Sequence, residues 1–106
     1  RCTLFVAQHL NKAAILEQFA EECAELSQAA LKYARILRGN NPTPVGELEA
    51  LERIQEETAD VLGCIETLRA AGVEQVESQR LWPIMNEKLE RWVKRLEERD
   101  GVQHEL

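Results

Sequence analysis

The chain has 106 residues and a mass of 12.1 kDa, which fits one domain spanning 1–106. Hydrophobic residues make up 44% of it, enough for a core but too few for a deep enclosed pocket. The formal charge of −6 and the pI near 5.0 provide no field that draws in nucleic-acid phosphates. We therefore expect no nucleic-acid polymer among its partners.

Cysteine usage and hydropathy bear on the compartment. The three cysteines, Cys2, Cys23 and Cys64, are an odd number and have no zinc-site spacing. No apolar run approaches the length of a membrane span, and no signal-peptide pattern is evident. These features predict a soluble cytoplasmic protein with reduced thiols and no membrane partner.

Helical periodicity dominates the chain from about 11 to 99. Asn11 is a candidate N-cap, residues 39–46 form a loop rich in Gly, Asn and Pro, and Gly72 and Gly101 are further breaks. Pro83 is expected to bend or divide the last helix and so to give four helices in all. The fold class is all-α: a four-helix, bundle-like arrangement with long antiparallel helices, completed by oligomerisation into a homodimer or homotetramer. The three predicted helical segments are 11–38, 47–71 and 73–99.

Apolar residues recur every three or four positions along the first two segments, which is the pattern of a packing seam. The short loop between the segments predicts that they pack as an antiparallel hairpin. The expected seam of the first segment is Leu16, Phe19, Cys23, Leu26, Ala30, Tyr33 and Leu37. That of the second is Leu51, Ile54, Thr58, Val61, Ile65 and Leu68.

Two pairs of acidic residues flank these seams on the same side. Glu22 and Glu25 are three residues apart, and Glu57 and Asp60 repeat that spacing. Pairing Glu22 with Asp60, and Glu25 with Glu57, gives both pairs the same midpoint, Asn41, inside the predicted loop. The sequence therefore predicts four carboxylates at one height on one edge of the hairpin.

Such a cluster repels itself unless protons or cations neutralise it. Oxygen ligands favour hard cations, so Mg²⁺, with Mn²⁺ as an alternative, is the predicted occupant. A di-iron site is disfavoured because neither His9 nor His104 stands in a Glu-x-x-His pattern. The competing interpretation is a solvated acidic face, since 19 acidic residues give such pairs by chance.

The last segment combines an apolar stripe with a basic flank. Lys88, Arg91 and Arg95 share a face that could hold a polyphosphate tail, although an ordinary surface helix laced with salt bridges explains much of the same pattern. The stripe, expected in the core, is Leu81, Met85, Leu89, Trp92 and Leu96.

Two short segments make the chain resemble a known family, the MazG-like all-α nucleoside triphosphate pyrophosphohydrolases. Their signature is Glu-x-x-Glu, a loop, and then Glu-x-x-Asp, and the resemblance covers about residues 15–95. The matching segments are Glu21-Glu22-Cys23-Ala24-Glu25-Leu26 and Glu56-Glu57-Thr58-Ala59-Asp60-Val61-Leu62, and Asn86-Glu87-Lys88 with Arg91 looks like the family's basic tail motif.

The resemblance implies Mg²⁺-dependent hydrolysis of a (deoxy)nucleoside triphosphate to the monophosphate and pyrophosphate. The family expectation for the biological role is removal of non-standard or excess nucleotides from the nucleotide pool. By position, the catalytic metal ligands would be Glu22, Glu25, Glu57 and Asp60, and the phosphates would be held by Lys88 and Arg91 with Asn86. Arg95 joins these substrate-binding residues as part of the basic flank. The alternative function is a non-catalytic helical adaptor or oligomerisation protein whose apolar seams bind a partner helix.

Overall fold

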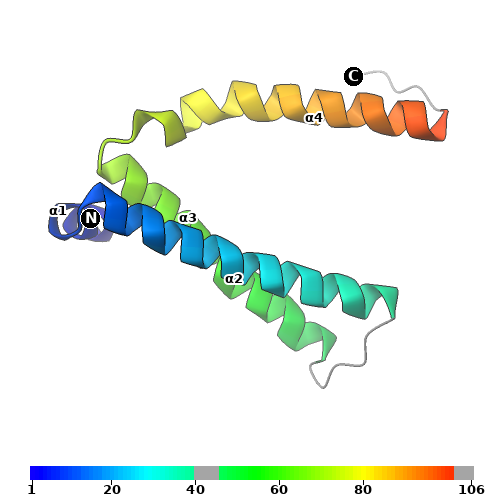
Figure 1. The fold of residues 1–106 in the computed structure, drawn as a ribbon, viewed down its shortest axis with the longest axis horizontal. Helices are drawn as coiled ribbons and strands as arrows, with labels where there is room; N and C mark the ends of the chain where they lie inside the picture. The colour runs from blue at the N-terminus through cyan, green and yellow to red at the C-terminus, as the bar shows by residue number, and fades with distance from the viewer. Residues whose placement is uncertain (40–45, 102–106) are drawn as a thin grey trace. The chain divides into compact units, whose positions relative to one another are not determined.

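The computed structural model describes residues 1–39 and 46–101, whose helices are drawn in Figure 1. Within these ranges the chain is all-helical and contains no strand, which confirms the predicted class. The elements are α1 (Cys2–His9), α2 (Lys12–Arg38), α3 (Glu47–Ala70), the 3-10 helix η1 (Glu74–Val76) and α4 (Ser78–Asp100). Most of the predicted loop (40–45) and His104 lie outside the described residues. None of the described helices is both long and apolar enough to span a membrane.

The chain divides into two compact units, Arg1–Gly72 and Val73–Leu106. In the first unit α2 packs along α3, and α1 packs on α3 (Figure 1). In the second unit α4 packs against η1. All four predicted carboxylates belong to the first unit, so the α2–α3 hairpin alone positions them.

The ends of α2 and α3 agree with the signals in the sequence. Asn11 caps α2, because its side-chain oxygen accepts a hydrogen bond from the amide of Ala14 at 2.8 Å. Gly39 ends the same helix with φ 67°, a left-handed conformation that favours glycine. Local residues thus set the length of the helix that carries Glu22 and Glu25.

The last segment differs from the prediction. Its break falls at Glu77, between η1 and α4, and α4 continues through Pro83. Proline removes one helical hydrogen bond, here the one to the carbonyl of Gln79, which is exposed and near the start of the helix. The described residues contain four α-helices, but the additional one is α1, which precedes the helical segments that the sequence analysis predicted.

Removing the cap of α2 tests how local signals contribute to the fold. We expect Asn11→Ala to lower the free energy of unfolding by about 1 kcal/mol, because the amide of Ala14 loses its acceptor. Urea titration followed by circular dichroism measures this change. Asn11→Asp, which keeps an acceptor, should restore most of it. Equal losses in both variants would contradict the capping role.

The packing seam of the hairpin includes acidic residues, which corrects the predicted seam. On α3 five of the six predicted positions are buried or half-buried, and only Leu51 is exposed. On α2 three of the seven are half-buried, and at the other four the residue one position earlier is buried or half-buried instead. Leu16 and Leu37 are 48% and 63% exposed, whereas Ile15 and Ala29 are buried. On α2 the buried and half-buried positions include Ile15, Phe19, Glu22, Leu26, Ala29, Tyr33 and Ile36. On α3 they include Ala50, Ile54, Glu57, Val61, Cys64 and Leu68. Glu22 and Glu57 therefore stand in the seam itself.

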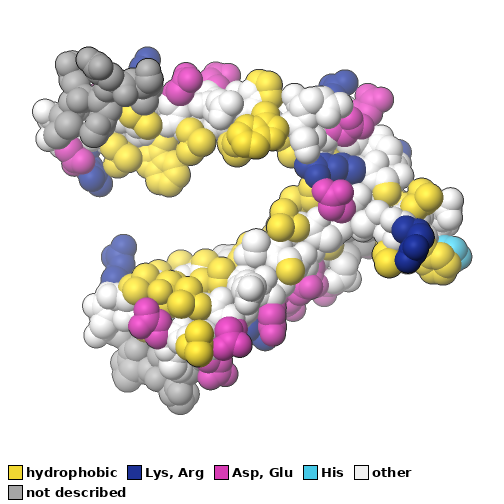
Figure 2. All heavy atoms as spheres, turned by 180° about the vertical axis from the view of Figure 1, so that it is seen from behind, with side chains coloured by type: hydrophobic (Ala, Val, Ile, Leu, Met, Phe, Trp, Pro, Cys, Tyr) yellow, Lys and Arg dark blue, Asp and Glu magenta, His cyan; other side chains and the backbone are white. Residues whose placement is uncertain are grey.

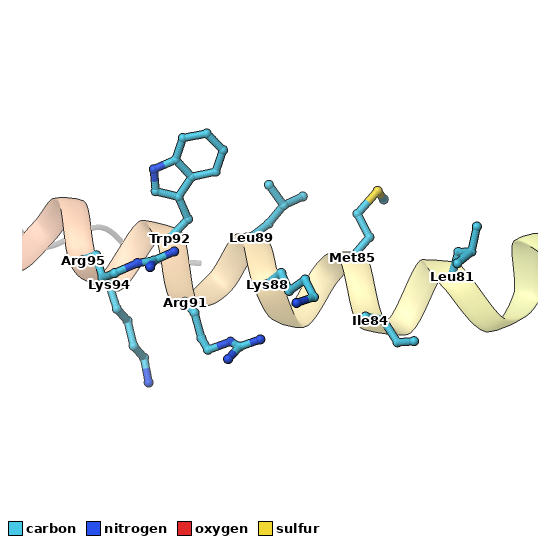
Figure 3. Close-up of a pocket in the computed structure, with 9 residues that line it drawn as sticks. All are labelled: Leu81, Ile84, Met85, Lys88, Leu89, Arg91, Trp92, Lys94 and Arg95. Carbon is cyan, nitrogen blue, oxygen red and sulfur yellow. The ribbon is translucent and has the colours of Figure 1, made fainter. Parts of the chain in front are cut away.

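The apolar stripe of α4 is largely exposed, contrary to its predicted place in a core. No residue of α4 is buried, and Trp92 is 57% exposed. Hydrophobic side chains gather along one side of α4 in Figure 2. In Figure 3 Leu89 and Trp92 project from one side of the helix and Arg91 and Lys94 from the other. The amphipathic pattern was identified correctly, but within its own unit this face packs on no second long helix.

Candidate metal centre

Four carboxylates meet where α2 crosses α3. One ligand oxygen from each of them can be chosen so that all lie within 4.8 Å of one another. The diagonally opposed ligands of an octahedral Mg²⁺ are about 4.2 Å apart, so small side-chain rotations bring this set to ligand distance. The contributing residues are Glu22 and Glu25 of α2 and Glu57 and Asp60 of α3. The structure thus brings together all four residues of the predicted cluster.

The cluster has a buried half and an exposed half. Glu57 is only 4% exposed and Glu22 is half-buried, whereas Glu25 and Asp60 are exposed. The two glutamates occupy equivalent seam positions, and the other two acids flank them. A ligand bound here would therefore contact two fixed, enclosed carboxylates and two that face solvent.

One oxygen of each buried glutamate is engaged, and the other is not. The Gln18 amide donates a hydrogen bond to Oε1 of Glu22 at 2.8 Å, and the Arg53 guanidinium lies 3.7 Å from Oε1 of Glu57. Both neighbours precede their glutamate by one helical turn. Oε2 of Glu22 and Oε2 of Glu57 are buried and make no hydrogen bond with the described residues. Two enclosed oxygens without a partner are costly unless a cation or a proton satisfies them.

Burial and mutual repulsion both favour protonation in the absence of a cation. Burial raises the pKa of Glu22, the neighbouring carboxyls of Asp60 and Glu25 raise it further, and the bond from Gln18 opposes them. Burial also raises the pKa of Glu57, aided by Glu25 and Asp60 and opposed by Arg53. The site thus holds carboxylates that are unstable as a metal-free set of four charges.

A pocket of about 370 Å³ opens beside the cluster, and the sequence analysis missed it. Glu22 and Asp60 lie in its wall together with Gln18 and Thr67. The helix α1 contributes Cys2, Thr3 and Val6 to the lining, and Leu10, which follows it, also lines the pocket. The apolar residues before Asn11 were the sequence signal for this pocket. They indicate a segment that packs on another helix, but they do not say which helix it packs on. The volume falls in the range of small-molecule sites.

The residues predicted to bind phosphate lie in the second unit. Asn86, Lys88, Arg91 and Arg95 are all exposed on α4, and the last three line its surface groove together with Trp92 (Figure 3). Lys88 and Arg91 make no ion pair with any residue in the described ranges. Their role at the phosphates stays a prediction.

Comparison of the chain with protein-family models, with curated proteins and with solved structures gave no match.

Proposed function

We propose that this chain is a Mg²⁺-dependent nucleotide pyrophosphohydrolase of the MazG-like type, which converts (d)NTP to (d)NMP and pyrophosphate. The observation that carries the proposal is the pair of buried, unpartnered oxygens of Glu22 and Glu57 within the four-carboxylate cluster. On an ordinary solvated acidic face, such oxygens would be exposed and hydrogen-bonded to water. An all-oxygen set with two enclosed members suits Mg²⁺ or Mn²⁺.

The four carboxylates divide the work of the site. Glu22 and Glu57, fixed in the seam, would hold the metal, and the exposed Glu25 and Asp60 would complete its ligands and orient the attacking water. Gln18 and Arg53 would keep the two buried carboxylates in position through their other oxygens. Bound Mg²⁺ would supply electrostatic stabilisation of the charge that develops on the phosphate oxygens.

The pocket beside Glu22 and Asp60 is the proposed binding site of the nucleoside. It is mainly apolar, and its few polar groups include Gln18 and Thr67. The hydroxyl of Thr67 donates to the carbonyl of Gly63 at 2.8 Å, so it can still accept a hydrogen bond from a ligand. A nucleoside in this pocket would direct its 5′-phosphates toward the carboxylates.

Oligomerisation into a homodimer or homotetramer is part of the proposal. Several positions of the predicted seam are apolar side chains that stay exposed on the hairpin, including Leu16, Leu37 and Leu51. The α4 stripe is likewise exposed. Covering both through self-association would complete a helical bundle.

Incubation with a panel of nucleoside di- and triphosphates and Mg²⁺ tests the activity. We expect pyrophosphate and a nucleoside monophosphate in equal amounts from at least one triphosphate, as measured by ³¹P NMR. Release of orthophosphate without pyrophosphate would mean cleavage at another bond. If no nucleotide is turned over with either Mg²⁺ or Mn²⁺, the enzymatic proposal is wrong.

A non-catalytic adaptor remains the second candidate because of α4. Trp82 and Trp92 are 58% and 57% exposed, and aromatic side chains of this kind anchor partner helices. The adaptor predicts no response of the melting temperature to divalent cations. A Mg²⁺-dependent rise in melting temperature separates the enzyme from the adaptor.

A further inference from the structure

A second hollow adjoins the carboxylates on the side away from α1. It has a volume of about 270 Å³, and Glu25 lies in its wall. Three cationic residues surround it: Lys32 and Arg35 of α2 and Arg53 of α3. We call it the basic hollow. It lies wholly within the α2–α3 hairpin, so it belongs to the same unit as the four carboxylates.

The helical repeat builds this hollow. Glu25, Gln28, Lys32 and Arg35 are spaced three, four and three residues apart, so they share one face of α2. Ala29 is buried, and its small side chain leaves room opposite Arg53. A row of polar side chains therefore runs from the carboxylates along α2, with Lys32 about 10 Å beyond Glu25 in helix rise.

The cations of the basic hollow have little to neutralise them. Neither Lys32 nor Arg35 forms an ion pair in the part of the chain that the structure describes. Arg53 contacts Glu57 through Nε at 3.7 Å, and its side chain is 60% exposed, so its remaining N–H groups can donate to a ligand while it stays beside Glu57. Three cations thus face one carboxylate, Glu25, in a chain whose net charge is −6. The basic hollow is thus a positively charged region next to a negatively charged cluster. Such a pair suits an anion that binds the cations at one end and a metal ion held by the carboxylates at the other.

We propose that the basic hollow binds the terminal phosphates of the substrate and the pyrophosphate that leaves. This inference rests on the proposed function, and it fixes the direction of the substrate along the hairpin. The nucleoside lies toward α1, against Glu22 and Asp60, and the outer phosphates lie toward Lys32 and Arg35. The hollow thereby selects ligands with at least two linked phosphates, since a monophosphate does not extend from the carboxylates to Lys32.

Calorimetric titration of the full chain with inorganic pyrophosphate, in the presence of Mn²⁺, tests the hollow. We expect Lys32→Gln/Arg35→Gln to weaken pyrophosphate binding at least tenfold. Lys12→Gln/Arg38→Gln is the matched control: it removes the same charge from the two ends of α2, outside the hollow, and should change the affinity by less than twofold. The single variant Lys32→Gln should weaken binding in the same direction, which covers the case in which the double variant does not fold.

Three results would overturn the proposal: no pyrophosphate binding by the wild type, equal losses in the two double variants, or a loss confined to Lys88→Gln/Arg91→Gln. The last result would assign the phosphates to α4. Mn²⁺ binding, measured on the same samples without pyrophosphate, separates this outcome from failure of the proposed function. If Lys32→Gln/Arg35→Gln still binds Mn²⁺ and its pyrophosphate affinity is unchanged, the phosphate site in the basic hollow is wrong and the metal site stands. If the wild type binds no Mn²⁺, the proposed metal site, and with it the proposed function, is wrong.

Discussion

Replacing Glu57 with glutamine is expected to abolish the rise in melting temperature that Mg²⁺ or Mn²⁺ gives the wild-type protein. The substitution keeps the size of the side chain but removes the charge of the most deeply buried member of the cluster. A ligand that binds only the native state raises its stability, so loss of binding removes that rise. Pyrophosphate release should fall by about 100-fold or more, since weaker perturbations around metal ligands already cost 10- to 100-fold.

The same substitution should have the opposite effect without metal. In a sample treated with EDTA, Glu57→Gln replaces a buried charged oxygen that has no hydrogen-bond partner with an uncharged NH2 group, which can donate to the neighbouring Glu25. We therefore expect its melting temperature to exceed that of the wild type by several degrees. Differential scanning fluorimetry with EDTA and with Mn²⁺ measures both effects. Glu56→Gln is the matched control, because this neighbouring glutamate is exposed and lies outside the cluster. If both variants keep the metal response, Glu57 is no ligand.

Metal-free protein is expected to lose stability as the pH rises from about 4.5 toward neutrality. The pKa values of Glu22 and Glu57 are raised above 4.5 in the folded state by burial and by the neighbouring carboxyls. Between the ordinary and the raised pKa the folded protein binds more protons than the unfolded chain, so the free energy of unfolding falls with rising pH. The stabilisation is complete below the ordinary pKa and is lost once the pH passes the raised values.

Melting curves in EDTA between pH 4 and pH 8 measure this slope. Glu22→Gln and Glu57→Gln should each flatten it, because each removes one of the two shifted groups. Saturating Mn²⁺ should also flatten it near neutral pH, since the cation then takes the place of the protons. A metal-free wild type that gains stability throughout this range would contradict the burial of the two glutamates.

The sequence predicted most of the helices and the meeting of the four acids, because both depend on short-range rules. Asn11 and Gly39 are capping signals that act within one turn. The shared midpoint of the acid pairs depends only on the constant rise of two antiparallel helices, and it was sufficient to place Glu22 near Asp60.

The seam of α2 was mispredicted by one residue at alternate positions for a physical reason, whereas that of α3 was predicted correctly except at Leu51. Leu16 and Cys23 are apolar, so they look better suited to burial than Ile15 and Glu22, and periodicity alone rates a buried glutamate as an error. The structure buries Ile15 and half-buries Glu22, while Leu16 and Cys23 stay exposed. A site that places charge in a packing seam is where hydrophobic patterning fails.

The pocket and the basic hollow could not be predicted because each depends on contacts between elements. The wall formed by α1 requires its packing on α3, which no periodic signal specifies. The hollow requires Arg53 to lie opposite the small side chain of Ala29, and the sequence analysis assigned no role to Lys32 or Arg35. The sequence analysis instead assigned all phosphate contacts to α4, because Lys88, Arg91 and Arg95 lie close together in the sequence at helical spacing.

The wall that α1 forms has a consequence for exchange of ligands. This helix has eight residues and buries none of them, and helices of that length are marginal without extensive packing. Its amides should therefore exchange with deuterium well before those of α2 and α3. Transient opening of α1 would expose the pocket while the paired helices keep the carboxylates together. A ligand could then enter or leave through motion of one short helix, without any rearrangement of the α2–α3 hairpin.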